Sequence, residues 1–151
     1  MDRIDRVSIV GMGAMGILYG DFFANALGRE QVTFLADSDR ARRYRNTPVY
    51  CNGRKMDFRI QDGAVPDSQG PAQLLLFAVK ATALGDAISV AGNQVGKDTV
   101  ILSVLNGITS EAVIGEALGM DHVLYCVSQG MDAVKLGNEL TYSHMGQICI
   151  G

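Results

Sequence analysis

Residues 7–20 read VSIVGMGAMGILYG, and this stretch decides the fold. The β-branched run over residues 6–10 predicts a strand. Apolar residues dominate from residue 14 to 27, interrupted only by a narrow polar stripe at Asp21 and Asn25, which predicts a mostly buried helix. Between strand and helix, the glycines stand at the spacing G-x-G-x-x-G, which in this context is typical of a dinucleotide-binding turn.

Each glycine of the motif has a physical reason. Gly11 permits a tight turn, Gly13 lets backbone N–H groups approach a pyrophosphate, and Gly16 allows the helix to pack closely on the strand. The anion then lies at the positive end of the helix dipole. Two alternatives are a tight turn without a ligand and a methyltransferase loop, but the latter commonly has an acidic residue just before the turn. The candidate cofactor-binding residues of the loop are Gly11, Met12, Gly13, Ala14, Met15 and Gly16.

The second predicted strand, over residues 31–36, leads to a mixture of charges. Asp37 lies 21 residues beyond Gly16, where a carboxylate accepts hydrogen bonds from ribose hydroxyls and favours NAD. Arg40, Arg42 and Arg43 follow, and an arginine near this position favours the 2′-phosphate of NADP. The arginines are equally compatible with a solvated helix face. Asp37 and Arg40 are therefore candidate cofactor-binding residues, and the choice of cofactor stays open.

The rest of the chain alternates between strand and helix patterns. Residues 49–60 predict a hairpin around Asn52-Gly53, because both turn positions need a positive φ. Continuous apolar runs alternating with helices indicate a parallel sheet covered on both faces. We therefore predict a Rossmann-like, doubly wound α/β fold with a mostly parallel sheet and small β-hairpin additions. The further elements predicted are strands over 74–79, 99–104, 122–127, 140–144 and 147–150, and helices over 82–91 and 109–118.

Lys80 and Asn106 each follow a predicted buried strand, at the edge where open α/β sheets bind ligands. A lysine there supplies a cation for a phosphate or carboxylate, and an asparagine amide both donates and accepts. A solvated lysine and an Asn-Gly turn are the alternatives. His122 and His144 have no partner at metal-ligand spacing, so no metal site is predicted.

Composition excludes several classes of protein. The chain has 151 residues, 48% apolar and 19% charged, with a net charge of −3, which is typical of one globular domain. The longest apolar run, residues 74–79, is far too short to cross a bilayer. No basic stripe suited to nucleic acid is present. Cys51, Cys126 and Cys149 suit a reducing cytoplasm, and we expect each to be a small buried hydrophobe.

Taken together, these segments resemble the ketopantoate reductases, or 2-dehydropantoate 2-reductases. The matching stretches are VSIVGMGAMG, FLADSDRARRYR with VYCNGRKMDFRI, AVKA at Lys80, ILSVLNGITSE around Asn106, and YCVSQGMDAV with GQICIG. The resemblance covers the family's amino-terminal cofactor domain. It implies a cytoplasmic enzyme that reduces 2-dehydropantoate to pantoate with NADPH, in pantothenate and coenzyme A biosynthesis.

The resemblance also implies roles for residues. Gly11, Gly13 and Gly16 would hold the pyrophosphate, Lys80 would help to bind the cofactor, and Asn106 would contact both cofactor ribose and substrate. The family's proton-donating lysine lies in a helical second domain, expected beyond residue 151, so no catalytic residue is expected in this chain. A homodimer is a further possibility.

One position departs from the family pattern. Many members have an arginine where this chain has Asp37, and our hypothesis is that Arg40, alone or with Arg42 or Arg43, contacts the 2′-phosphate instead. NAD(H) is therefore not excluded. The alternatives are an NAD-dependent 2-hydroxyacid dehydrogenase on the same scaffold and a non-catalytic nucleotide-sensing domain.

Overall fold

The structure, a computed structural model, describes residues 3–105 and 109–151. At its centre lies a parallel sheet of five strands in the order β5-β2-β1-β6-β7. The order reverses beside β1, since the chain continues from β1 to β2 on one side and returns to β6 on the other. The strands are β1 (Val7–Val10), β2 (Val32–Ala36), β5 (Arg59–Asp62), β6 (Leu74–Phe77) and β7 (Val100–Ser103).

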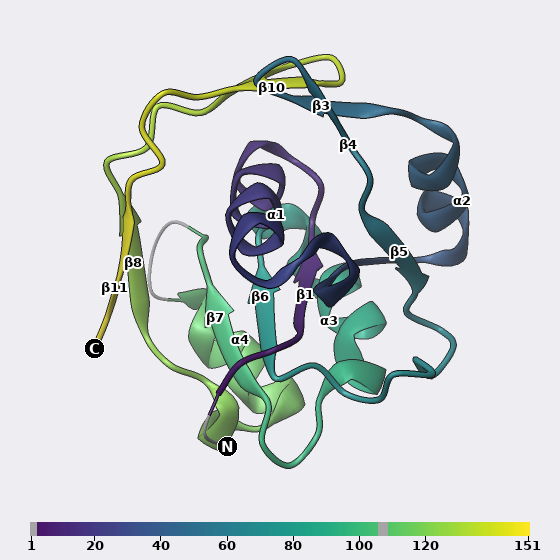
Figure 1. The fold of residues 1–151 in the computed structure, drawn as a ribbon. Coiled ribbons are helices and arrows are strands. Elements are labelled where there is room, and N and C mark those ends of the chain that lie inside the picture. The colour runs from purple at the N-terminus through teal and green to yellow at the C-terminus, as the bar shows by residue number, and fades with distance from the viewer. Residues whose placement is uncertain (1–2, 106–108) are drawn as a thin grey trace.

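Helices cover both faces of this sheet, which confirms the predicted doubly wound α/β fold (Figure 1). On one face, Ile9 and Phe34 pack in one apolar cluster with Tyr19 of α1 (Ala14–Leu27). On the other face, side chains of the strands pack against α3 (Leu84–Ala91) and α4 (Thr109–Leu118). Because both faces are buried, the strands read as continuous apolar runs.

A second, smaller sheet covers the side of α1 that faces away from the central sheet (Figure 1). Ile17 and Leu18 of α1 pack there against Val49, Cys51 and Leu140. Its strands, in the order β4-β3-β10-β9, are β3 (Val49–Cys51), β4 (Arg54–Met56), β9 (Val134–Leu136) and β10 (Glu139–Thr141). Enclosure between two sheets explains why α1 is apolar on most of its circumference.

The narrow polar stripe of α1 includes Asp21, which is only 1% exposed. Its carboxylate accepts a hydrogen bond from the Tyr142 hydroxyl at 2.6 Å and one from Nη2 of Arg54 at 3.2 Å. Burial and this carboxylate raise the pKa of the Tyr142 hydroxyl. The same two causes raise the pKa of the Cys51 thiol to about 11. The buried acid therefore ties α1 to the small sheet.

The predicted hairpin is present, with φ of 50° at Asn52 and 79° at Gly53. Its second half, however, divides between two sheets, because β4 ends at Met56 and the chain then enters the central sheet at Arg59 as β5. Helix α2 (Ser38–Asn46) lies beside these segments (Figure 1).

The strand predicted over residues 122–127 is wrong. His122 ends a short 3-10 turn (Met120–His122), and Val123 forms a single parallel bridge to Ile101. The chain then leaves the central sheet, and β8 (Cys126–Gln129) pairs with β11 (Gln147–Ile150) as an antiparallel ribbon. The remaining 3-10 turns are Arg29–Gln31, Ala81–Ala83 and Gly92–Gln94.

The expectation that every cysteine is buried is also wrong. Cys51 is buried, Cys126 is half-buried and Cys149 is exposed, and the last two lie on the two-stranded ribbon. All three cysteines are free.

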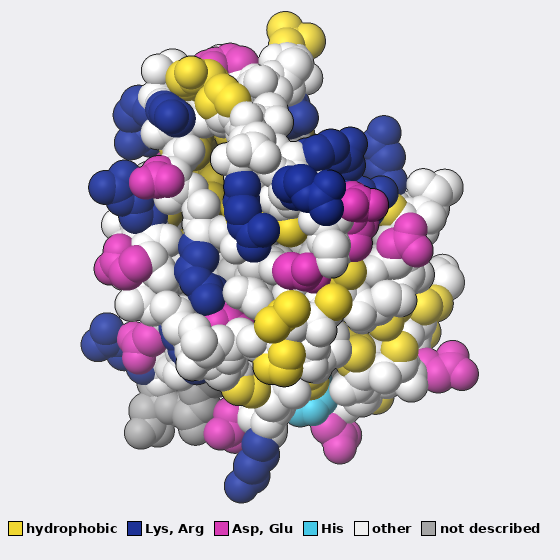
Figure 2. All heavy atoms as spheres, turned by 90° about the vertical axis from the view of Figure 1, so that its right-hand side faces the viewer, with side chains coloured by type: hydrophobic (Ala, Val, Ile, Leu, Met, Phe, Trp, Pro, Cys, Tyr) yellow, Lys and Arg dark blue, Asp and Glu magenta, His cyan; other side chains and the backbone are white. Residues whose placement is uncertain are grey.

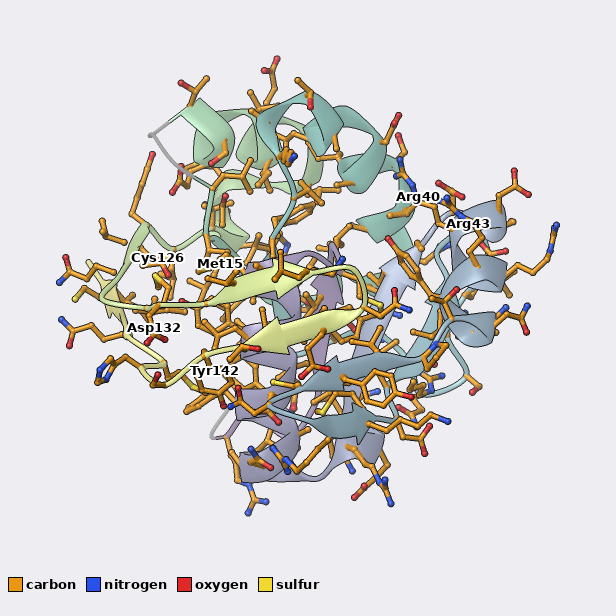
Figure 3. The ribbon with its side chains drawn as sticks, turned by 90° about the horizontal axis from the view of Figure 1, so that it is seen from above. Met15, Arg40, Arg43, Cys126, Asp132 and Tyr142 are labelled. Carbon is orange, nitrogen blue, oxygen red and sulfur yellow. The ribbon has the colours of Figure 1, made fainter. Side chains whose placement is uncertain are left out.

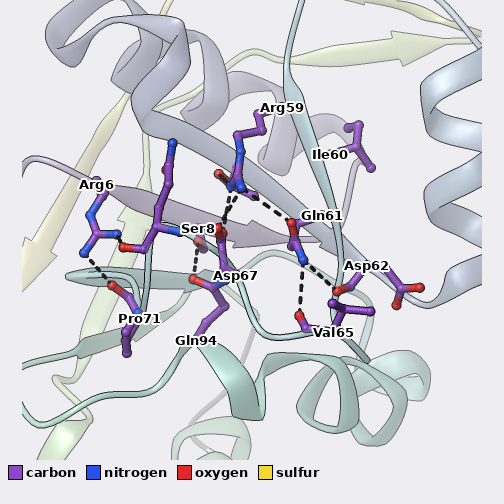
Figure 4. A network of polar contacts seen from close by, with 12 residues as sticks. Arg6, Ser8, Arg59, Ile60, Gln61, Asp62, Val65, Asp67, Pro71 and Gln94 are labelled. Carbon is purple, nitrogen blue, oxygen red and sulfur yellow. Dashed lines mark hydrogen bonds and ion pairs between the residues drawn. The ribbon is translucent and has the colours of Figure 1, made fainter.

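The loop from β5 to β6 contains no α-helix and is held instead by buried polar contacts (Figure 4). The two terminal nitrogens of the Arg59 guanidinium, Nη1 and Nη2, each donate to the carboxylate of Asp67 at 2.7 Å. Gln94 donates to the same carboxylate at 3.1 Å and accepts from the Ser8 hydroxyl at 3.0 Å. These hydrogen bonds connect the loop to two strands of the sheet and to the turn after α3. Within the described residues, no helix is both long and apolar enough to span a membrane.

Candidate functional site

The loop between β1 and α1 requires glycine at two positions. Gly11 has φ of 109°, and a Cβ on it would lie 2.2 Å from the carbonyl oxygen of Ala78. A Cβ on Gly16 would lie 1.8 Å from the carbonyl oxygen of Gly11. Both distances are far below van der Waals contact, so the first and third glycines of the motif fix the turn and the close approach of helix to strand.

Gly13 differs from these two, because a Cβ there would meet no atom of residues 3–105 or 109–151 within 4 Å. It is the residue that precedes α1, its φ of −87° is available to any amino acid, and no side chain caps the helix. The first turn of α1 also contains no acidic residue. The uncapped N–H groups of a 14-residue helix therefore border open space, and the helix dipole favours an anion there.

The other three residues of the motif turn their side chains inward. Met12, Ala14 and Met15 are half-buried and pack against the apolar clusters around α1. Figure 3 shows Met15 near the middle of the molecule, away from α2 and its arginines. These residues can therefore contribute backbone N–H groups to a ligand, whereas their side chains support the loop from behind.

Asp37 and Arg40 lie together just after β2. The Asp37 carboxylate accepts from the backbone N–H of Arg40 at 2.8 Å and thereby caps α2. Nη1 of Arg40 lies 3.7 Å from the other carboxylate oxygen, and both side chains are almost half exposed. Arg40 and Arg43 project outward from α2 (Figure 3). A ligand at this position would meet a carboxylate and a guanidinium side by side.

Lys80 lies on the opposite side of the glycine loop from Asp37. Strand β1 pairs with both β2 and β6, with Val10 aligned to Leu35 and to Phe77. The backbone N–H of Ala78 then donates to the carbonyl of Val10 at 2.9 Å. Lys80, two residues later, is exposed and begins the turn Ala81–Ala83. The glycine loop is therefore flanked by Asp37 and Lys80, at the carboxyl edge where the strand order reverses, which is where open α/β sheets bind ligands.

Asn106 lies outside the described residues, so its predicted contact with substrate stays a prediction. The structure adds a buried polar cluster between the end of β7 and the start of α4, which the sequence interpretation did not single out. The Ser103 hydroxyl lies 2.9 Å from that of Ser110, which donates to Glu111 at 3.0 Å. The Cys126 thiol donates to the Ser103 carbonyl at 3.1 Å, and burial and Glu111 raise the pKa of this thiol.

Glu111 is only 2% exposed although it is an acidic residue, and it stands on the inward side of α4. The signal in the sequence was an acid in the first turn of a helix, which is also the ordinary pattern of a solvated helix start. Across residues 3–105 and 109–151, no three His, Cys, Asp or Glu side chains are grouped as metal ligands would be.

Comparison with known proteins identifies the family. The family model described as "Ketopantoate reductase PanE/ApbA" matches residues 7–151, which is nearly the whole chain.

The chain belongs to the ketopantoate reductase family.

Solved structures with the same fold include a putative 2-dehydropantoate 2-reductase from Enterococcus faecalis, 21% identical with a TM-score of 0.75, matched over 95% of this chain and 47% of that one. A ternary complex of D-mandelate dehydrogenase with NADH and anilino(oxo)acetate is 19% identical, with a TM-score of 0.75 over 96% and 47% of the two chains. A dimeric ketopantoate reductase from Staphylococcus aureus is 18% identical, with a TM-score of 0.65 over 91% and 44%. The chain therefore spans about half the length of the structures that it matches.

Proposed function

We propose that this chain is the cofactor-binding part of an oxidoreductase that reduces ketopantoate to pantoate with NADPH. One observation carries the proposal: at Gly13, uncapped backbone N–H groups border open space at the point where the strand order reverses. Membership of the ketopantoate reductase family supports the same reaction. A pyrophosphate is the group that such a helix start and glycine turn accommodate best.

The chain's own residues would bind and orient the cofactor. The N–H groups of residues 13–16 would hold the pyrophosphate, Asp37 and Arg40 would meet the adenosine ribose, and Lys80 would add a positive charge on the opposite side. Asn106 would contact ribose and substrate. The bound nicotinamide supplies the hydride, and the protein supplies orientation and electrostatics.

The choice of NADPH rests on Arg40. Asp37 alone would repel a 2′-phosphate, but the guanidinium of Arg40 lies 3.7 Å from its carboxylate and is exposed. An incoming phosphate can therefore pair with Arg40, and with the other arginines of α2, in place of that carboxylate. Titrations of the chain with NADPH and NADH test this proposal. We expect tighter binding of NADPH and loss of that preference in Arg40→Ala; an equal or stronger affinity for NADH, unchanged in Arg40→Ala, would overturn it.

A second candidate is an NAD-dependent reductase of another 2-keto acid. Asp37 at the end of β2 favours it, because a carboxylate there suits the free ribose of NAD. The similarity in fold to a D-mandelate dehydrogenase that binds NADH points the same way. A panel of 2-keto acids assayed with the complete gene product and both cofactors distinguishes the two candidates.

We also propose that turnover requires a helical second domain beyond residue 151, which would supply the proton-donating lysine, in a cytoplasmic homodimer. The lengths of the matched structures support a second domain, and the dimeric S. aureus reductase supports a dimer. The test compares two proteins. The 151-residue chain should bind NADPH without reducing ketopantoate, and the complete gene product should reduce it. Turnover by the 151-residue chain alone would contradict this division of labour.

A further inference from the structure

A second hollow, which we call the α2–hairpin cleft, lies between the end of α2, the β3–β4 hairpin and the start of β5. Its volume is about 390 Å³, within the range of small-molecule sites. Among the described residues that line it, Met12 comes from the glycine loop, whereas Asp37, Arg40 and Lys80 do not take part. The cleft is therefore next to the candidate dinucleotide site but distinct from it.

The lining of the cleft includes polar side chains, such as Asn46 and Thr47, and an apolar part, which we call its floor. The floor is formed by the side chains of Met12, Val49, Met56, Phe58 and Ile60. The ring of Phe58 packs on that of Phe34, with 4.6 Å between the ring centroids, and so is anchored to the central sheet. A fixed apolar floor in an open hollow favours a ligand with an apolar, preferably flat, body.

The rim of the cleft is positively charged. Arg45 donates to the Ile60 carbonyl at 3.2 Å, which holds its guanidinium at the cleft, and Lys55 stands on the hairpin opposite. The acid on the rim, Asp57, faces Arg29 at 3.9 Å. Arg43 and Arg45, in the last turn of α2, also offset the partial negative charge of the helix end.

Basic side chains near the cleft add to the positive electrostatic potential at its rim. Residues 29–60 carry eight basic and four acidic side chains, although the whole chain has a net charge of −3. Figure 2 shows Lys and Arg side chains gathered over the upper part of the face that carries α2 and β5. Summed charges of one sign raise the local concentration of ligands of the opposite sign.

We propose that the α2–hairpin cleft binds a small organic anion with an apolar body, such as an aromatic carboxylate or sulfonate. The apolar body lies on the floor, and the acidic group pairs with Lys55 and Arg45 at the rim. The ligand lies against Met12 and leaves the N–H groups at the start of α1 free. This site does not depend on the proposed reductase activity.

The test is a titration of the 151-residue chain with 8-anilinonaphthalene-1-sulfonate, followed by fluorescence and by amide NMR shifts. We expect saturable binding that shifts the amides of Asn46, Thr47, Lys55 and Met56. Lys55→Gln and Arg45→Gln should each weaken binding roughly two- to fivefold, the effect of removing one partly exposed ionic contact. Lys135→Gln is the matched control, because this exposed lysine on β9 does not line the cleft, and it should leave the affinity unchanged.

Two results would overturn the proposal. One is binding that is insensitive to both Lys55→Gln and Arg45→Gln. The other is a set of shifts centred on the apolar groove beside Phe22 and Leu124 instead of on the cleft. Gly13→Val separates the two sites, since it should abolish NADPH binding and leave the fluorescent anion bound. Failure of the unmodified chain to bind NADPH would contradict the proposed function and would not alter the result at the cleft.

Discussion

Replacing Asp67 with asparagine should destabilise the fold in a way that depends on pH. The carboxylate is 3% exposed and receives two hydrogen bonds of 2.7 Å from Arg59, together with contacts from Gln94 and from the Gln69 backbone N–H. These hydrogen bonds, above all those from Arg59, lower the pKa of Asp67 from an ordinary 3.8 to about 2. Such a shift corresponds to about 2 kcal/mol of the free energy of unfolding.

The lowered pKa of Asp67 determines how the free energy of unfolding changes with pH. The ionised Asp67 stabilises the folded state above pH 3.8, and this contribution is lost as the pH falls toward about 2. Asp67→Asn also leaves the half-buried Arg59 without its ionic partner. At pH 7 we therefore expect a loss of about 2–4 kcal/mol, which should shrink as the pH is lowered toward 2.

The assay is urea unfolding followed by circular dichroism at pH 7 and at several values down to pH 2.5. Asp39→Asn is the matched control, because its carboxylate pairs with Arg42 in an ion pair that is almost fully exposed. The control should be as stable as the unmodified chain. An Asp67→Asn protein that matches this control at pH 7, or whose deficit is the same at pH 2.5, would refute the reasoning.

Three further predictions concern the glycine loop, the buried acid and the thiols. Gly16→Ala should destabilise the fold by several kcal/mol in thermal unfolding, because its Cβ would lie 1.8 Å from the carbonyl oxygen of the first glycine of the loop; an unchanged midpoint would contradict this. Tyr142→Phe should cost about 1–2 kcal/mol in urea unfolding, because the buried Asp21 loses a hydrogen bond of 2.6 Å, whereas the same change at an exposed tyrosine should cost little. In a thiol-labelling experiment at pH 8, the exposed Cys149 should react first and the buried Cys51, whose pKa is about 11, last; the reverse order would contradict the placement of these residues.

The central sheet could be predicted because its signals are local. Apart from Ser8, the runs over residues 7–10, 32–36 and 74–77 consist of apolar or β-branched residues, and Gly11 and Asp37 directly follow the first two runs. The hairpin at Asn52-Gly53 could also be predicted, because both turn positions have a positive φ, which Asn and Gly adopt readily. Where the residues of a short segment determine its conformation, the sequence alone is enough to predict that element.

The pairing of the shorter strands could not be predicted in this way. Apolar and polar residues alternate over residues 56–60, and this pattern does not reveal that the chain moves from one sheet to the other at Asp57 and Phe58. Strand β8 pairs with β11, about 20 residues later in the chain, and does not join the central sheet as the sequence pattern predicted. Such choices depend on tertiary contacts that a local pattern does not contain.

In the candidate site, too, some features follow from local sequence and others depend on tertiary packing. The turn leaves no room for a side chain at Gly11 or Gly16, as the motif predicted, whereas the approach of a pyrophosphate at Gly13 stays a prediction. The capping contact between Asp37 and the backbone of Arg40 fits a spacing of three residues, but the sequence pattern did not predict that α2 begins at Ser38. The burial of Glu111 depends on how α4 packs, so no local signal identified it.

The most direct test of the proposed dinucleotide site is isothermal titration calorimetry of NADPH into the 151-residue chain and its Gly13→Val variant. Because a Cβ at Gly13 would have no atom of the described residues within 4 Å, the variant should keep its fold and thermal midpoint. Its side chain would occupy the space in front of the N–H groups of α1. We expect one NADPH per chain for the unmodified protein and no measurable binding to Gly13→Val. Equal affinities for the two proteins, or no binding by either, would contradict a phosphate site at this loop.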